Sequence, residues 1–269
     1  MVELFETELM DDGRRSSKGN QLKWESGGIW FKADYLGYEG LSEFVISSLL
    51  EKSSLEEAEY VKYGLETIRY KNNIFTGCRS RDFAEGYMTI TLERLFKTLY
   101  GKGLNEGIYS IGDHTERLKF LVDQVERTTG IQGFGLYMSK MLTIDSLFLN
   151  EDRHTHNISI LWDGNREFRL CPIYDNGAAL MSDTRLDYPL GLDIYTEKKR
   201  VKPKLFCDSF EEQLDIAESL YGKNISFNWK RGDVDEILSH AGIYEKTATD
   251  RVRDLLIEQR REHSYLFLQ

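Results

Sequence analysis

The first third of the chain alternates short strand-like stretches with one helical stretch. Residues 28–34 form an aromatic, apolar piece with strand character, and alternating apolar positions predict further strands at 60–69 and 73–78. Between them, apolar residues at positions 41, 44, 45 and 48 or 49 follow the helical period, which predicts a helix over 41–50 that packs by one face. We therefore expect a small sheet with one helix in this part of the chain.

From about residue 89 the pattern turns helical. Predicted helices span 89–100, 113–128, 131–149, 208–221, 231–240 and 245–261. Two short strands, Ile158–Trp162 and Phe168–Ile173, interrupt this series, and Asp163-Gly164-Asn165 between them is a strong hairpin signal. A shift in composition near 83–89 predicts a β-rich N-terminal lobe over 1–83 and a mainly helical C-terminal lobe over 84–269. The expected fold class is α+β, with two lobes and a functional cleft between them.

The composition is that of an ordinary globular protein, and it removes several function classes. The 269 residues, 41% of them hydrophobic, are enough to bury a substantial core. A net charge of -10 is opposite in sign to that of a protein whose main task is holding nucleic acid. Cys78, Cys171 and Cys207 lack the spacing of a disulfide framework or a zinc site, so we expect buried or free thiols in a reducing compartment.

No stretch of the sequence predicts an export or membrane segment. The N-terminal residues are acidic and contain no long apolar run, which argues against an ordinary secretory signal. No run approaches the roughly 20 apolar residues that span a bilayer. The expected location is cytoplasmic, with export of an effector by a signal-independent route as the open alternative.

The residues with the clearest chemistry surround the predicted hairpin. Asp152 to Asn157 lie between a buried helix and the first strand, and Asp175 follows the second strand. Phosphoryl transfer needs one carboxylate that orients the acceptor hydroxyl or accepts its proton. It also needs hard oxygen ligands, such as those of Asn157 and Asp175, that hold Mg²⁺ against the phosphates. Taken singly, Asp152 would be an ordinary loop residue and Asp175 a turn former. Together, and in this order of lobes, they favour an ATP-dependent kinase.

A lysine in the apolar strand supports the same chemistry. Lys32 lies within the apolar run 29–33, where an unpaired ammonium would be costly, and Glu43 follows in the predicted helix. A strand lysine that pairs with a helix glutamate and contacts nucleotide phosphates is the kinase arrangement. The alternatives are a Lys32 that faces solvent and a Glu43 that only marks a helix start. The Gly/Ser/Lys segment 13–23 before this strand is a candidate phosphate-covering loop or a linker.

His154 and His156 offer a different interpretation. An HxH pair with scattered carboxylates is compatible with a zinc or iron hydrolase. The other histidines, His114, His240 and His263, lie in helical or terminal segments and form no supporting pattern. In the kinase interpretation, one histidine of the pair packs beneath the loop and supports the backbone of Asp152.

These motifs resemble those of the HipA-like serine/threonine kinases, distant relatives of the phosphoinositide 3/4-kinase fold. Residues 152–160, DRHTHNISI, are similar to the family's catalytic loop DxHxxNFSI, and residues 172–175, PIYD, to its magnesium motif PLYD. Residues 16–23, SSKGNQLK, resemble the phosphate loop SxxGxQxK, and Trp30-Phe31-Lys32 resembles the strand that bears the ATP lysine. The resemblance spans residues 16–175 in the family's order.

The resemblance implies a role for each matching residue. Asp152 would be the catalytic aspartate, and Asn157 and Asp175 the Mg²⁺ ligands. Lys32 would contact the phosphates of ATP. The rest of the nucleotide-binding set would be Ser16, Ser17, Lys18 and Gly19 of the phosphate loop, with Tyr174 at the border of the pocket. Ser16, or the adjacent Ser17, matches the loop serine that some members autophosphorylate, and residues 78–83 fall where the adenine-binding hinge is expected.

The sequence thus predicts an ATP- and Mg²⁺-dependent serine/threonine protein kinase with a protein-kinase-like fold. It would phosphorylate a serine or threonine hydroxyl of a protein, including one of its own. The alternatives are a lipid or small-molecule kinase of the same fold and a non-catalytic nucleotide-binding module. Neither nucleic acid nor a membrane is an expected partner. Full-length toxin kinases of the family carry a long segment before the phosphate loop, and only a short one precedes it here. The chain is therefore similar to the compact CtkA-like members, and an antitoxin-type partner is the less favoured option.

Overall fold

The computed structural model describes residues 1–10, 21–84 and 86–268, which divide into two compact units. Unit 1 comprises Met1–Phe83, Tyr174–Val201 and Ser226–Gln269, and unit 2 comprises Ala84–Ile173 and Lys202–Ile225. A break after residue 83 therefore occurs, as composition suggests, but two later segments group with the N-terminal part of the chain. The assignment of functional lobes to 1–83 and 84–269 stays a prediction.

The described residues of unit 1 form a five-stranded sheet in the order β1-β4-β5-β3-β2. Its strands are β1 (Val2–Leu4), β2 (Lys23–Ser26), β3 (Ile29–Ala33), β4 (Gly64–Tyr70) and β5 (Asn73–Arg81). On one face Trp24, Phe31 and Ile68 are buried in an apolar cluster, since alternate residues of a strand point to the same face. The β3 strand, which carries Lys32, lies between β5 and β2 and is therefore held on both edges.

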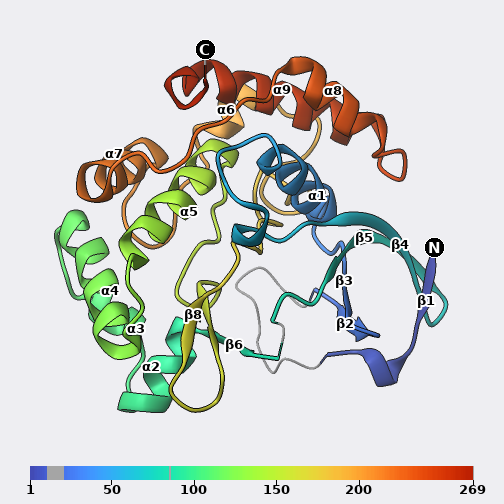
Figure 1. Cartoon of the computed structure of the whole chain (residues 1–269). Coiled ribbons are helices and arrows are strands. Elements are labelled where there is room, and N and C mark those ends of the chain that lie inside the picture. The colour runs from blue at the N-terminus through green and yellow to red at the C-terminus, as the bar shows by residue number, and fades with distance from the viewer. Residues whose placement is uncertain (11–20, 85, 269) are drawn as a thin grey trace. The chain divides into compact units, whose positions relative to one another are not determined.

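The single long helix of the N-terminal part, α1 (Glu39–Leu50), packs closely against β5 (Figure 1). Two glycines allow close approaches around β5. A Cβ at Gly40 would lie 2.6 Å from the carbonyl carbon of Gly77, and a Cβ at Gly77 would lie 2.1 Å from the Lys32 carbonyl oxygen. Real Cβ atoms do not come this near to backbone atoms, so Gly40 lets α1 pack on β5, and Gly77 lets β5 lie close to β3, the strand that carries Lys32.

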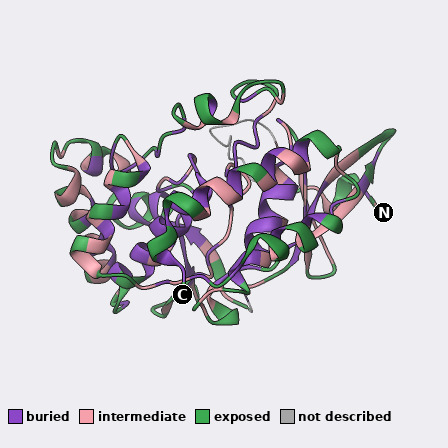
Figure 2. Cartoon of the chain, turned by 90° about the horizontal axis from the view of Figure 1, so that it is seen from above, coloured by how far each residue is buried: buried purple, intermediate pink, exposed green. Residues whose placement is uncertain are grey.

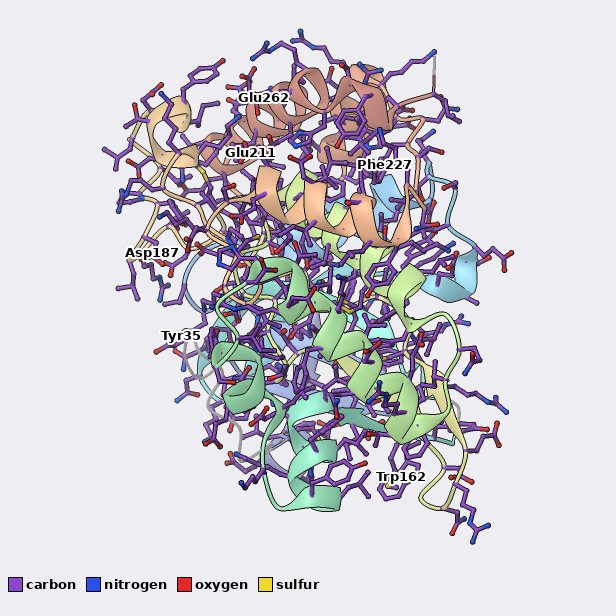
Figure 3. All side chains as sticks on the ribbon, turned by 90° about the vertical axis from the view of Figure 1, so that its left-hand side faces the viewer. Tyr35, Trp162, Asp187, Glu211, Phe227 and Glu262 are labelled. Atoms are coloured by element: carbon purple, nitrogen blue, oxygen red, sulfur yellow. The ribbon has the colours of Figure 1, made fainter. Side chains whose placement is uncertain are left out.

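The C-terminal segments of unit 1 are helical. They contain α6 (Ile194–Lys198), α8 (Arg231–Ser239) and α9 (Lys246–Glu262), followed by a short 3-10 turn at Ser264–Leu266. Two further 3-10 turns of the unit lie at Glu6–Glu8 and Glu57–Glu59. The Trp229 ring meets Phe267 edge to face at 4.8 Å, and Phe267 also packs on Phe227; Phe227 is labelled in Figure 3. The apolar residues of α9 recur at the helical period and are buried on one side, which fixes this helix to the unit.

Unit 2 combines a three-stranded sheet with helices. The sheet, in the order β6-β7-β8, contains β6 (Met88–Thr91), β7 (Ser159–Trp162) and β8 (Phe168–Leu170). The helices are α2 (Leu92–Tyr100), α3 (Leu104–Tyr109), α4 (His114–Thr129), α5 (Phe134–Phe148) and α7 (Phe210–Tyr221). Helix α5 packs on α4 and α7 and is buried around most of its circumference, whereas other helices show buried and exposed residues on different faces (Figure 2). The hairpin β7–β8 is closed by Trp162 (Figure 3), which stacks on Phe168.

Most predicted elements occur close to their expected bounds, including the hairpin and the helices at 41–50, 131–149 and 231–240. The helix predicted over 89–100 is wrong at its start, because 88–91 pair with β7 as a strand and the helix begins only at Leu92. The second hairpin strand ends at Leu170 and not at 173. The three cysteines are free and buried, as expected. No helix in the described ranges combines the length and apolar character needed to cross a bilayer.

Candidate active site

Lys32 lies between two carboxylates of unit 1. Its Nζ is 2.7 Å from Oε1 of Glu43 on α1 and 2.8 Å from Oδ1 of Asp175, the residue that follows the PIY segment. The side chain of Lys32 is only 11% exposed and that of Glu43 only 2%. The prediction that Lys32 pairs with Glu43 is therefore confirmed, and the alternative of a solvent-facing Lys32 is wrong. The contact with Asp175 joins residues 143 positions apart and was not anticipated.

The charge of Lys32 is maintained by these two neighbours. Burial alone would lower the pKa of the ammonium, but the carboxylates of Asp175 and Glu43 outweigh that effect and hold the pKa well above its ordinary value. The Nζ also lies 5.3 Å from the centroid of the Tyr63 ring, whose negative face favours a cation. Lys32 is thus a permanent, nearly buried cation.

Glu43 connects the lysine to the segment that follows Asp175. Its second oxygen, Oε2, accepts a hydrogen bond from the backbone N–H of Asn176 at 2.9 Å. The same segment is held to the start of α1 at two further points: Tyr38 donates from its hydroxyl to the Leu180 carbonyl, and Ser42 donates to the Ala179 carbonyl. Helix α1, Lys32 and the Asp175 segment therefore form one hydrogen-bonded assembly.

The backbone of Asp175 is in the left-handed region, with φ at 63°. Residues other than glycine adopt this region rarely, and they do so mostly in turns and at functional sites. The ion pair with Lys32 and the Asn176–Glu43 hydrogen bond hold this conformation. The turn-former description of Asp175 is correct as far as it goes, but the side chain is also directed to the lysine.

Tyr174 packs against residues of the segment 78–83, where the adenine-binding hinge is expected. Its ring lies 5.3 Å from that of Phe83, and both pack against a cluster of Val61, Tyr63 and Cys78. Residues from both ends of the predicted hinge, 78 and 83, thus contact one apolar cluster with Tyr174. Burial holds the pKa of the Cys78 thiol well above its usual value, so this cysteine is an apolar wall and not a nucleophile.

The catalytic loop candidate lies in unit 2 and is closed by the side chain of Asn157. The Asn157 amide donates from Nδ2 to the backbone carbonyl of Asp152, and its Oδ1 accepts the backbone N–H of His154 at 2.7 Å. Both ends of the loop are thereby fixed to one amide group. Because an amide oxygen has two lone pairs, Oδ1 can bind a metal ion in addition to the His154 N–H.

Arg153, which was not among the predicted site residues, anchors this loop to helix α5. Its guanidinium binds Asp145 of α5 with Nε at 2.9 Å from Oδ2 and Nη2 at 3.0 Å from Oδ1, and Asn150 donates to the same carboxylate. Both charged side chains are buried, at 3% and 0% exposure. On a second side, the hydroxyl of Thr155 lies 2.8 Å from Oδ1 of Asn105.

The two histidines of the HxH pair differ in their surroundings. Their rings meet edge to face at 5.5 Å, with His154 partly buried and His156 exposed. Burial lowers the pKa of His154, partly offset by the nearby carboxylate of Asp152, so the imidazole is neutral at pH 7. His154 lies beside Asp152, with its Nε2 3.7 Å from Oδ1, while the buried support of the loop comes mainly from Arg153.

The donor chemistry of two predicted ligands suits Mg²⁺. Asp175 in unit 1 offers a carboxylate and Asn157 in unit 2 an amide oxygen, and Mg²⁺ prefers such hard oxygen ligands together with phosphate oxygens and water. In the described ranges, no three His, Cys, Asp or Glu side chains gather as a group that could hold a metal ion. The phosphate-loop candidates Ser16, Ser17, Lys18 and Gly19 lie outside the described residues.

A partly buried carboxylate, that of Asp34, supports the start of α1. Asp34 accepts hydrogen bonds from the Gly40 N–H at 2.6 Å and from the hydroxyls of Thr76 and Tyr244, each at 2.7 Å. Burial raises the pKa of Asp34 to about 6, against the effect of these hydrogen bonds. Asp34 thus links β3, β5 and the α8–α9 turn to the helix that carries Glu43.

The raised pKa of Asp34 predicts a pH-dependent stability. Because the folded protein binds the Asp34 proton more tightly than the unfolded chain, stability falls as pH rises from about 4 to about 6 and stays reduced above that. The loss amounts to about 3 kcal/mol at pH 7. Asp34→Asn is expected to remove this part of the pH dependence, measured by urea unfolding at pH 5 and pH 7. If the free energy of unfolding changes by the same amount between pH 5 and pH 7 in Asp34→Asn and in wild type, the prediction is wrong.

Comparison with known proteins gives matches in structure and none in sequence. No protein-family model and no curated protein matches the chain. The crystal structure of the Helicobacter pylori proinflammatory kinase CtkA aligns with a TM-score of 0.60 and 15% identity, covering 97% of this chain and 95% of that one. HipA of Shewanella oneidensis MR-1, solved with HipB and operator DNA, aligns with a TM-score of 0.43 and 10% identity over 94% of this chain and 62% of that one.

The CtkA alignment includes nearly the whole of both chains and therefore shows the fold. It confirms the predicted α+β class, with a sheet in the N-terminal part and mainly helical segments after it. The chain thus has the kinase-like fold of CtkA, and its resemblance to the compact HipA-like kinases holds at the level of the fold.

Proposed function

We propose that the chain is an ATP- and Mg²⁺-dependent serine/threonine protein kinase that also phosphorylates itself. The observation that carries the proposal is the assembly of Lys32, Glu43 and Asp175, in which a nearly buried cation lies 2.8 Å from a carboxylate suited to Mg²⁺. An ammonium has three N–H donors, and the hydrogen bonds to Glu43 and Asp175 use two of them. The third would be available to a phosphate oxygen of ATP.

The roles of the chain's own residues follow from their contacts. Lys32 would bind the phosphates of ATP, held in place by Glu43. Asp175 and Asn157 would hold Mg²⁺, which neutralises phosphate charge when bound. Asp152 would receive the proton of the acceptor hydroxyl, on a loop fixed by Asn157 and Arg153. Tyr174 and Phe83 would border the adenine.

The proposed acceptor follows from the motif resemblance. Ser16 and Ser17 are the hydroxyls of the loop that resembles the phosphate loop, so the chain's own loop would be an acceptor. A phosphate added there would place roughly two negative charges next to the nucleotide phosphates, and it would therefore lower the affinity for ATP.

Intact-mass spectrometry tests the proposal. The purified protein, incubated with ATP and Mg²⁺, is expected to gain the mass of one phosphoryl group, and peptide mapping is expected to assign it to Ser16 or Ser17. A parallel screen offers protein, phosphoinositide and aminoglycoside acceptors. Labelling of a lipid or an aminoglycoside without any protein labelling would overturn the choice of acceptor, and no transfer in any arm would overturn the kinase activity.

A further inference from the structure

A lysine far along the chain contacts the candidate catalytic carboxylate. The Nζ of Lys204 lies within hydrogen-bonding distance of Oδ1 of Asp152, 52 residues away, and both belong to unit 2. The Asp152 side chain is 14% exposed and that of Lys204 35%. Because Asp152 is largely shielded from water, this pair is stronger than the usual pair on an open surface.

The main chain around Lys204 is held in place. Pro203 and Leu205 on either side of it are buried, so the lysine side chain is directed outward between two anchored residues. The hydroxyl of Tyr109, at the end of α3, donates to the Lys204 carbonyl oxygen at 3.1 Å. The reach of the ammonium to Asp152 is thus set by the packing of the segment and not only by the flexible side chain.

The other supports of the loop act on its backbone or on other side chains. Asn157 binds the Asp152 carbonyl, and Arg153 binds Asp145, so neither fixes the rotation of the Asp152 carboxylate. The Nζ of Lys204 lies within hydrogen-bonding distance of Oδ1 of this carboxylate, whereas Nε2 of His154 is 3.7 Å from the same oxygen. An ammonium on Oδ1 favours one orientation of the carboxylate.

We propose that Lys204 is a positioning residue for phosphoryl transfer, which it aids by holding the Asp152 carboxylate in the orientation that receives the acceptor hydroxyl. This inference rests on the proposed function. In the transfer, the acceptor oxygen forms a bond to the γ-phosphorus and the bond from that phosphorus to the β–γ bridging oxygen breaks. ADP leaves, and the hydroxyl proton passes to Asp152. An error of about 1 Å in the position of such a group can cost about a hundredfold in rate.

Three variants test the role of Lys204 through kinetics. Lys204→Met is expected to lower kcat by about tenfold to a hundredfold without changing KM for ATP, because Asp152 loses its orientation while Lys32 still binds the phosphates. Lys204→Arg keeps a cation with a similar reach and is expected to recover most of the rate. Lys202→Met, an exposed lysine two residues earlier, is the matched control and is expected to match wild type. Equal kcat for Lys204→Met and Lys202→Met, or no recovery with Lys204→Arg, would overturn the proposal.

A measurement without turnover separates this inference from the proposed function. Melting temperatures of Lys204→Met, Asp152→Asn and the double variant form a thermodynamic cycle. The ion pair predicts that the two single losses do not add, and additive losses would overturn the contact on which the proposal depends. If the losses in melting temperature are not additive but the protein transfers no phosphate to any acceptor, the Lys204–Asp152 pair is upheld. The kinase function is then refuted, and the role of Lys204 in transfer with it.

Discussion

Lys32→Met is expected to lower phosphate transfer about a hundredfold to a thousandfold, which is the size of effect seen when a preorganised charge partner of the transition state is removed. Lys32 is the cation between Glu43 and Asp175, and methionine fills its volume without the charge. The same change leaves Glu43 as a buried carboxylate, so it is also expected to destabilise the protein by about 3–5 kcal/mol. Transfer from labelled ATP and urea unfolding measure the two effects.

Two further variants make the result interpretable. Lys32→Arg keeps the charge, and it should preserve more stability than activity, because a planar guanidinium does not replace a compact ammonium between two carboxylates. Lys71→Met removes an exposed surface pair with Glu6 and should leave both activity and stability close to wild type. Wild-type transfer rates in Lys32→Met would show that the Lys32 assembly is structural and not part of an active site.

Arg153→Met is expected to destabilise the protein by about 3–5 kcal/mol, the largest effect on stability that we predict for a single residue of the catalytic loop. The substitution leaves Asp145 on α5 as a buried carboxylate that keeps its hydrogen bond from Asn150 but loses its cation. Chemical unfolding monitored by fluorescence gives the size of the loss.

The double variant Asp145→Leu/Arg153→Met distinguishes the reasons for that loss. Because well-packed apolar residues can replace a buried pair at little cost, the double variant should regain much of the stability lost by Arg153→Met. It should still lose activity, since the loop that carries Asp152 is no longer anchored to α5. Arg169→Met, which breaks an exposed pair with Glu167, serves as the surface control. A loss below about 1 kcal/mol in Arg153→Met, typical of exposed pairs, would contradict the prediction.

Local patterns predicted the parts of the fold that depend on local chemistry. The helical period over 41–50 and the hairpin signal at Asp163-Gly164-Asn165 correspond to α1 and to β7–β8. The cost of burying an unpaired lysine in an apolar strand correctly gave the Lys32–Glu43 pair. The strand β6 was missed because residues 88–91 form it only by pairing with β7, some seventy residues later.

The contacts that were missed are those between distant segments. Nothing in the spacing of the sequence connects Lys32 with Asp175, or Lys204 with Asp152. Arg153 could have been suspected, because an arginine next to a buried helix with an aspartate near its end needs a partner. The role of Gly40 is visible only in the structure, where its lack of a side chain lets α1 pack against β5.

The most direct test of the kinase proposal is transfer of label from γ-labelled ATP by wild type, Asp152→Ala and Asp175→Ala under identical conditions. We predict labelled product with wild type and none with either variant, while circular dichroism and melting show that both variants remain folded. Asp152 would be needed to receive the acceptor proton and Asp175 to hold Mg²⁺ beside Lys32. Undiminished labelling by both folded variants would contradict the assignment of this site.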